Sequence, residues 1–158
     1  MNQKPVVGPA IWFSEMVIRD GGTGKLSLIN CFQRFFAPSF PFAAPSFFVT
    51  VSFSGLKGKV EKLKLSVEMV NEEGKLVLEP VTTEVATQTE TEPDESFELS
   101  FFIGSCEFEK PGSHRVIFKI DDKIMGERAL PGAILPQAPV PLPTPETAEA
   151  KTPAKKKK

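Results

Sequence analysis

The clearest pattern in the chain is an alternation of apolar and polar residues over 62–70. Its apolar members fall on every second position, and they are Leu63, Leu65, Val67 and Met69. Polar residues occupy the positions between them. Because a strand points successive side chains to opposite faces, this period of two predicts a strand with one face in a core and one in water.

The same alternation recurs over 97–103, where every second residue is apolar, namely Phe97, Leu99, Phe101 and Ile103. Residues 46–54 alternate in the same way, and β-rich runs cover 11–19, 25–35, 76–89, 114–120 and 123–130. No long segment shows the i, i+3, i+4 spacing of an amphipathic helix. Seven or eight short strands predict an all-β fold, and we expect an antiparallel two-sheet β-sandwich, immunoglobulin-like in general build, with a small closed barrel as the alternative.

Turn residues separate the expected strands. Asp20–Gly24 predicts a hairpin turn between the first two strands, and Asn71–Lys75 a turn in which Gly74 takes a positive φ. Asp121 and Asp122 form an expected two-residue turn. Pro80 cannot donate a hydrogen bond to a neighbouring strand, so its strand is expected either at a sheet edge or interrupted at this residue.

The glycine-rich stretch at 20–25, DGGTGK, superficially resembles a phosphate-binding loop. In the pattern Gly-x-x-x-x-Gly-Lys-Ser/Thr, however, Arg19 stands at the first glycine and Leu26 at the hydroxyl position. A dinucleotide-binding pattern fails at Ser27, and no helix is expected after it to hold an anion. We therefore interpret this stretch as a hairpin turn.

Composition divides the 158 residues into three parts. We expect an N-terminal extension at 1–9, a β-sandwich domain at 10–131 and a disordered Pro/Ala/Lys-rich tail at 132–158. The chain holds seven prolines from residue 131 onward and almost no large apolar side chains there, so this part cannot bury enough surface to offset its ordering entropy.

The net charge of −1 is distributed unevenly, with +3 on residues 136–158 and −4 on the rest. One alternative function is nonspecific contact with a polyanion, either nucleic acid or an acidic membrane, through Lys155, Lys156, Lys157 and Lys158. No apolar run reaches the roughly 18–20 residues of a transmembrane segment. The N-terminus makes a poor signal peptide, which predicts a cytoplasmic protein.

The two cysteines, Cys31 and Cys106, are expected to be free thiols in that compartment. A bridge between the two sheets is the alternative, and it requires an oxidising environment. There is no CxxC motif and only one histidine, His114, so we expect no metal site and no cofactor. The acidic stretch 90–98, ETEPDESFE, lacks the spacing of a calcium loop and is interpreted as a solvated loop.

His114 is the only histidine in the chain, so any acid–base or nucleophilic catalysis by an imidazole must use it. It follows a Pro-Gly turn at the start of an expected strand, where aromatic residues often serve packing. A structural role is the preferred interpretation. The alternative is a small enzyme that uses His114 with Cys106 or nearby carboxylates.

A phenylalanine-rich connection spans 32–53 and contains eight of the 14 phenylalanines. Three of them, Phe36, Phe40 and Phe42, are separated by prolines. They either plug one end of the sandwich or form an exposed apolar patch for a partner or for self-association. If the chain has a binding surface, this is the expected one.

Three stretches together carry a family resemblance: MVIRDGGTGKLSLINCF, APSFPFAAPSFFVTVSF and FEKPGSHRVIFKIDDKIMGE. The chain resembles an uncharacterised family of small bacterial β proteins, known only as a domain of unknown function, over about residues 10–130. Asn30 stands where such proteins often have glycine, and His114 where an aromatic such as tyrosine is usual. The resemblance implies a β-sandwich and brings no established activity, so it assigns no functional residue.

These observations lead to one functional expectation. We expect a non-catalytic, cytoplasmic protein-interaction or scaffold module, whose partner the sequence does not identify. The small enzyme and the basic-tail contact stay as alternatives.

Overall fold

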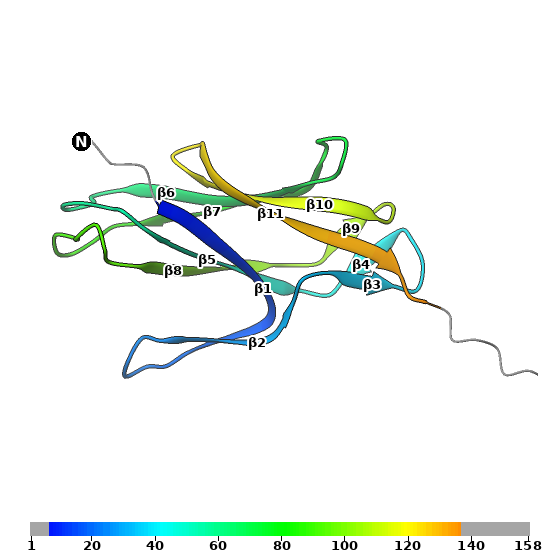
Figure 1. Cartoon of the computed structure of the whole chain (residues 1–158), viewed down its shortest axis with the longest axis horizontal. Helices are drawn as coiled ribbons and strands as arrows, with labels where there is room; N and C mark the ends of the chain where they lie inside the picture. Colours follow the sequence, from blue (N-terminus) through cyan, green and yellow to red (C-terminus); the bar gives the residue numbers. More distant parts are fainter. Residues whose placement is uncertain (1–6, 137–158) are drawn as a thin grey trace, which may run out of the picture.

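The structure, a computed structural model, describes residues 7–136, and all of its regular elements are strands (Figure 1). Two sheets face one another across a shared apolar core. The fold is therefore the all-β two-sheet sandwich that the alternation predicts.

One sheet has four strands in the order β2-β1-β5-β8. All neighbours in this sheet are antiparallel. Their bounds are β1 (Val7–Arg19), β2 (Leu26–Phe32), β5 (Phe47–Ser54) and β8 (Phe97–Ile103). The β1–β2 hairpin extends away from the body of the sandwich, at the bottom of Figure 1.

The other sheet has five strands in the order β3-β11-β10-β6-β7. Its bounds are β3 (Phe35–Ala37), β6 (Leu63–Val70), β7 (Leu76–Val85), β10 (Gly112–Ile120) and β11 (Lys123–Ile134). β3 runs parallel to β11, whereas the other neighbours are antiparallel. A separate two-stranded ladder pairs β4 (Phe42–Ala44) with β9 (Cys106–Phe108).

The alternating positions lie where the sequence predicts them. Leu63, Leu65, Val67 and Met69 are all buried in the core. On β8, Phe101 and Ile103 are buried, while Phe97 and Leu99 are partly buried against the same cluster. The one-faced pattern is thus confirmed for β8, whereas on β6 Ser66, expected on the side facing water, is buried as well.

The predicted turns are also confirmed. Asp121 and Asp122 have φ of 46° and 63°, as a tight turn between β10 and β11 requires, and Gly74 has φ of 78°. In the 20–24 turn, the Asp20 carboxylate accepts hydrogen bonds from the backbone N–H groups of Gly22 and Thr23 and from the Thr23 hydroxyl. These bonds lower the pKa of Asp20. β7, which contains Pro80, lies at the edge of its sheet.

The short strands β3, β4 and β9 are not apparent from the sequence, because each has only three residues and no room for a periodic pattern. Regular structure runs from Val7 to Ile134. β11 continues past residue 131 because Gly132, Ala133 and Ile134 pair with β3. The expected tail from residue 137 onward lies outside the described residues.

The pairing of β3 with β11 places the Phe35 ring directly over Gly132. A methyl group added at Gly132 would lie 2.8 Å from two carbons of that ring. Carbon atoms that are not bonded to each other do not come this close, so Gly132 provides space that no other residue type provides. The ring is then held by the neighbouring aromatic side chains described below.

We expect Gly132→Ala to destabilise the protein by about 1–3 kcal/mol, because the added methyl must displace a packed ring. Chemical denaturation monitored by circular dichroism measures this. Gly104→Ala is the matched control, because no atom of the described residues lies within 4 Å of its added carbon. The control should change the free energy of unfolding by less than about 0.5 kcal/mol. Equal effects of the two substitutions would contradict the packing argument.

Candidate functional site: an aromatic pocket

A cavity of about 380 Å³ opens where the connection between β2 and β5 crosses the end of the sandwich. Phenylalanines from five different strands line it, namely Phe32, Phe35, Phe36, Phe42, Phe47 and Phe108. Its volume lies within the range of about 300–1,000 Å³ that is usual for ligand pockets. The pocket is therefore an apolar site large enough for a few side chains.

The centre of this aromatic cluster is Phe35. Its ring centroid lies 4.3 Å from that of Phe108 and 6.1 Å from that of Phe42. The ring centroid of Phe40 lies 6.4 Å from that of Phe35. Such spacings are typical of favourable aromatic pairs, so the wall of the pocket is a packed unit.

Two charged residues, Glu15 and Arg34, also line the pocket. Glu15 belongs to β1, and its carboxylate accepts a hydrogen bond of 2.7 Å from the Asn30 side-chain amide. Asn30 itself has φ of 52°. This left-handed conformation is uncommon for residues other than glycine, and asparagine is among those that adopt it most readily. Arg34 lies in the short link between β2 and β3.

The three phenylalanines singled out from the sequence occupy different positions. Phe36 is 44% exposed and lines the pocket. Phe42 also lines it but is partly buried against the core. Phe40 packs against the core behind Phe35 and Phe42 and is not part of the lining. The connection thus contributes both to the core and to an accessible surface.

Several members of this site cannot be found from the sequence alone. Phe108 lies far from the 32–53 connection in sequence, and no local pattern links it to Phe36. Arg34 and Glu15 carry no local pattern either. The high density of phenylalanine in 32–53 is the one signal that could have pointed to the region.

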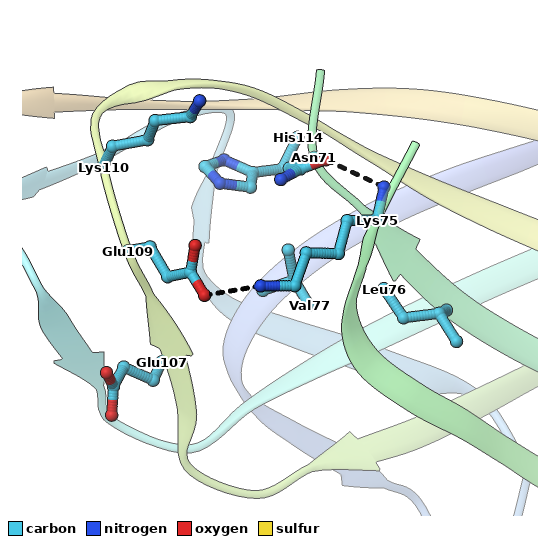
Figure 2. Close-up of a pocket in the computed structure, with 8 residues that line it drawn as sticks. All are labelled: Asn71, Lys75, Leu76, Val77, Glu107, Glu109, Lys110 and His114. Carbon is cyan, nitrogen blue, oxygen red and sulfur yellow. Dashed lines mark hydrogen bonds and ion pairs between the residues drawn. The ribbon is translucent and has the colours of Figure 1, made fainter. Parts of the chain in front are cut away.

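A second cavity of about 240 Å³ lies next to His114 (Figure 2). The other residues that line it are Asn71, Lys75, Leu76, Val77, Glu107, Glu109 and Lys110. Lys75 and Glu109 form an ion pair of 2.7 Å across its mouth. Asn71 accepts hydrogen bonds from the backbone N–H groups of Glu73 and Lys75, which holds the turn after β6.

His114 is only 3% exposed, and its Nδ1 has no hydrogen-bond partner among residues 7–136. Its ring packs edge-on against Phe108, with centroids 4.6 Å apart. Burial lowers the pKa of His114, because the charged imidazolium is disfavoured away from water. His114 therefore belongs to the aromatic packing that also forms the wall of the first pocket.

Cys106 lies on β9 and is buried. Burial raises the pKa of its thiol to about 11. Since the thiolate is the nucleophilic form, this environment is the opposite of the one that activates a catalytic cysteine. Cys31 lies on β2 and is exposed, and both cysteines are free thiols.

The other sequence candidates are readily located. The 20–24 stretch is a turn with no helix behind it. In the described part of the chain, no group of three metal-ligating side chains comes together, and no helix has the length and apolar character needed to cross a membrane. Lys155–Lys158 lie outside the described residues.

A second apolar surface lies on the outer face of the four-stranded sheet. Its exposed side chains are Trp12, Met16, Ile18, Ile29 and Phe102. Phe102 packs edge-on against Phe48, with centroids 5.3 Å apart. This surface lies on the opposite side of the sheet from the core and is separate from the aromatic pocket. A substitution on it is therefore a control for substitutions in the pocket.

Fold and pocket together define a small β-sandwich domain with an aromatic pocket at one end. The chain belongs to the family of unknown function DUF6941, which it matches over residues 10–131. No curated protein matches it.

Among solved structures, the chain is similar to a β-glucosidase from Listeria innocua in complex with isofagomine, with 13% identity and a TM-score of 0.44. The structure of the same enzyme without that compound has 13% sequence identity to this chain and a TM-score of 0.43. The match covers 80% of this chain and 16% of the β-glucosidase chain. Similarity at this level carries no argument about activity.

The exposure of the two thiols predicts a difference in reactivity. A maleimide should label Cys31 rapidly in the native protein and label Cys106 only after unfolding, because Cys106 is buried and protonated. Mass spectrometry should then count one label under native conditions and two in denaturant. Cys31→Ser should remove the native label. Rapid native labelling of both thiols would contradict this arrangement.

The burial of His114 predicts how stability depends on pH. In the unfolded chain His114 binds a proton below its ordinary pKa of about 6.5, whereas the buried His114 of the folded chain resists protonation. Protonation therefore favours the unfolded state, and the free energy of unfolding should fall as the pH is lowered from 7 to 5.5. His114→Phe should flatten this slope. The pKa values of Asp20 and Glu109 are lowered from already acidic values, so these groups titrate below this window. Denaturation at several pH values tests the prediction, and equal slopes for both proteins would refute it.

Proposed function

We propose that this protein is a non-catalytic protein-interaction module that binds an extended, proline-rich peptide of a partner protein in the aromatic pocket. The observation that carries the proposal is the accessible cavity lined by six phenylalanines, with Arg34 beside them. A bacterial, cytoplasmic setting is part of the proposal. The two free thiols support the cytoplasmic compartment, because thiols stay reduced there.

The chemistry of the pocket favours proline over other peptides. A polyproline II segment is already extended and has no internal hydrogen bonds, so it loses little entropy when it docks on aromatic rings. Its carbonyl groups need donors, and the Arg34 guanidinium carries five N–H groups. Proline has no backbone N–H, so such a ligand demands few acceptors from a mostly apolar wall.

Catalysis has weaker support. An enzyme that uses His114 needs a partner for the imidazole, but Nδ1 has none among the described residues, and Glu109 is engaged by Lys75. The raised pKa of Cys106 disfavours a thiolate nucleophile. Contact with nucleic acid or a membrane through Lys155–Lys158 rests on charge alone.

The probe for this proposal is a fluorescein-labelled decaproline peptide, whose anisotropy is followed as the full chain is added up to millimolar concentration. We expect saturable binding, and we expect Phe36→Ala to weaken it about tenfold or more, as truncation of a central aromatic contact does. Phe36 is exposed, so the substitution should leave the core intact.

Phe102→Ala is the matched control, since Phe102 is 57% exposed but lies on the outer face of the other sheet. It should bind the probe like the unaltered chain. The proposal fails if the probe does not bind, or if Phe102→Ala weakens binding as much as Phe36→Ala.

A further inference from the structure

The described chain ends beside the wall of the aromatic pocket. Gly132 and Ala133 on β11 pair with Phe35 and Phe36, two residues of the pocket lining. One step further, the Leu135 N–H donates a 2.9 Å hydrogen bond to the Ala37 carbonyl. The last described residues therefore run along β3, the strand that carries two of the pocket phenylalanines (Figure 1).

The sequence that follows has the composition of a ligand for such a pocket. Residues 136–145 read PQAPVPLPTP, with five prolines and the apolar residues Val140 and Leu142 between them. At about 3.1 Å per residue, ten residues in the polyproline II conformation span ~30 Å. That reach is ample for a segment tethered at the edge of the pocket.

We propose that residues 136–145 of the same chain occupy the aromatic pocket, so that a partner must displace them. This inference rests on the proposed function, because it names the chain's own segment as the resident proline-rich ligand. Val140 and Leu142 give this segment apolar side chains, which suit a lining made mostly of phenylalanines.

Tethering makes even a weak contact effective. A short tether gives a segment an effective concentration on the order of 1 mM at a neighbouring site. A segment with an intrinsic Kd of about 0.1 mM then fills the pocket most of the time and weakens an external ligand about tenfold.

The test compares three full-length chains. One is unaltered, one carries Pro139→Ser, Pro141→Ser and Pro143→Ser, and the control carries Lys155→Ser, Lys156→Ser and Lys157→Ser. The two variants each change three residues after Pro136, but only the first removes prolines from the inferred ligand. All substitutions lie beyond β11, so folding of the sandwich is not at issue.

Two readouts are taken from each chain. The first is the amide NMR spectrum, in which we expect the signals of Phe36, Ala37 and Phe108 to shift in the proline variant and to stay in place in the lysine control. The second is the affinity for the decaproline probe, which should be about tenfold tighter for the proline variant than for the unaltered chain.

The outcomes separate this inference from the proposed function. If the amide spectra of the unaltered chain and the proline variant coincide around the pocket, and the probe binds both equally, the inference is overturned while peptide binding stands. If the probe binds none of the chains, the proposed function itself falls. A shift difference that vanishes on dilution would assign the occupant to a second copy and overturn occupancy within one chain.

Discussion

The contact on which this end of the molecule depends is that between the Phe35 ring and Gly132. β3 pairs with β11 through only three residues, so backbone hydrogen bonds alone hold it weakly. The ring lies over the glycine and against Phe108, which connects β3 to the small β4–β9 ladder as well as to the five-stranded sheet. Without space at Gly132, this packing has no room to form.

The same aromatic cluster stabilises the fold and leaves an opening. Phe35 and Phe108 face the core on one side and the pocket on the other, and they also pack against His114. The pocket is thus a consequence of how the connection between β2 and β5 closes the end of the sandwich. Glu15 and Arg34 are the charged residues of its lining.

Local patterns predicted most of the framework. Alternation identified β6 and β8, turn chemistry identified the hairpins at Gly74 and Asp121–Asp122, and Pro80 correctly placed β7 at an edge. Local patterns could not reveal β3, β4 and β9, whose three residues each form strands only because distant partners are present. The density of phenylalanine pointed to the connection at 32–53 as a candidate binding surface. The different roles of Phe36, Phe40 and Phe42 depend on which residues surround each ring in the folded chain.

The sequence by itself determined that the chain is all-β, where its long strands lie and that its glycine-rich stretch is a hairpin turn. These properties follow from period-two burial and from turn residues, which act between neighbours in the chain. Only the tertiary structure decided that phenylalanines from five strands converge on one cavity, that His114 is buried with no described partner for Nδ1, and that the thiol of Cys106 is held protonated. Each depends on contacts between residues far apart in sequence, and the burial they produce sets both the packing and the pKa values.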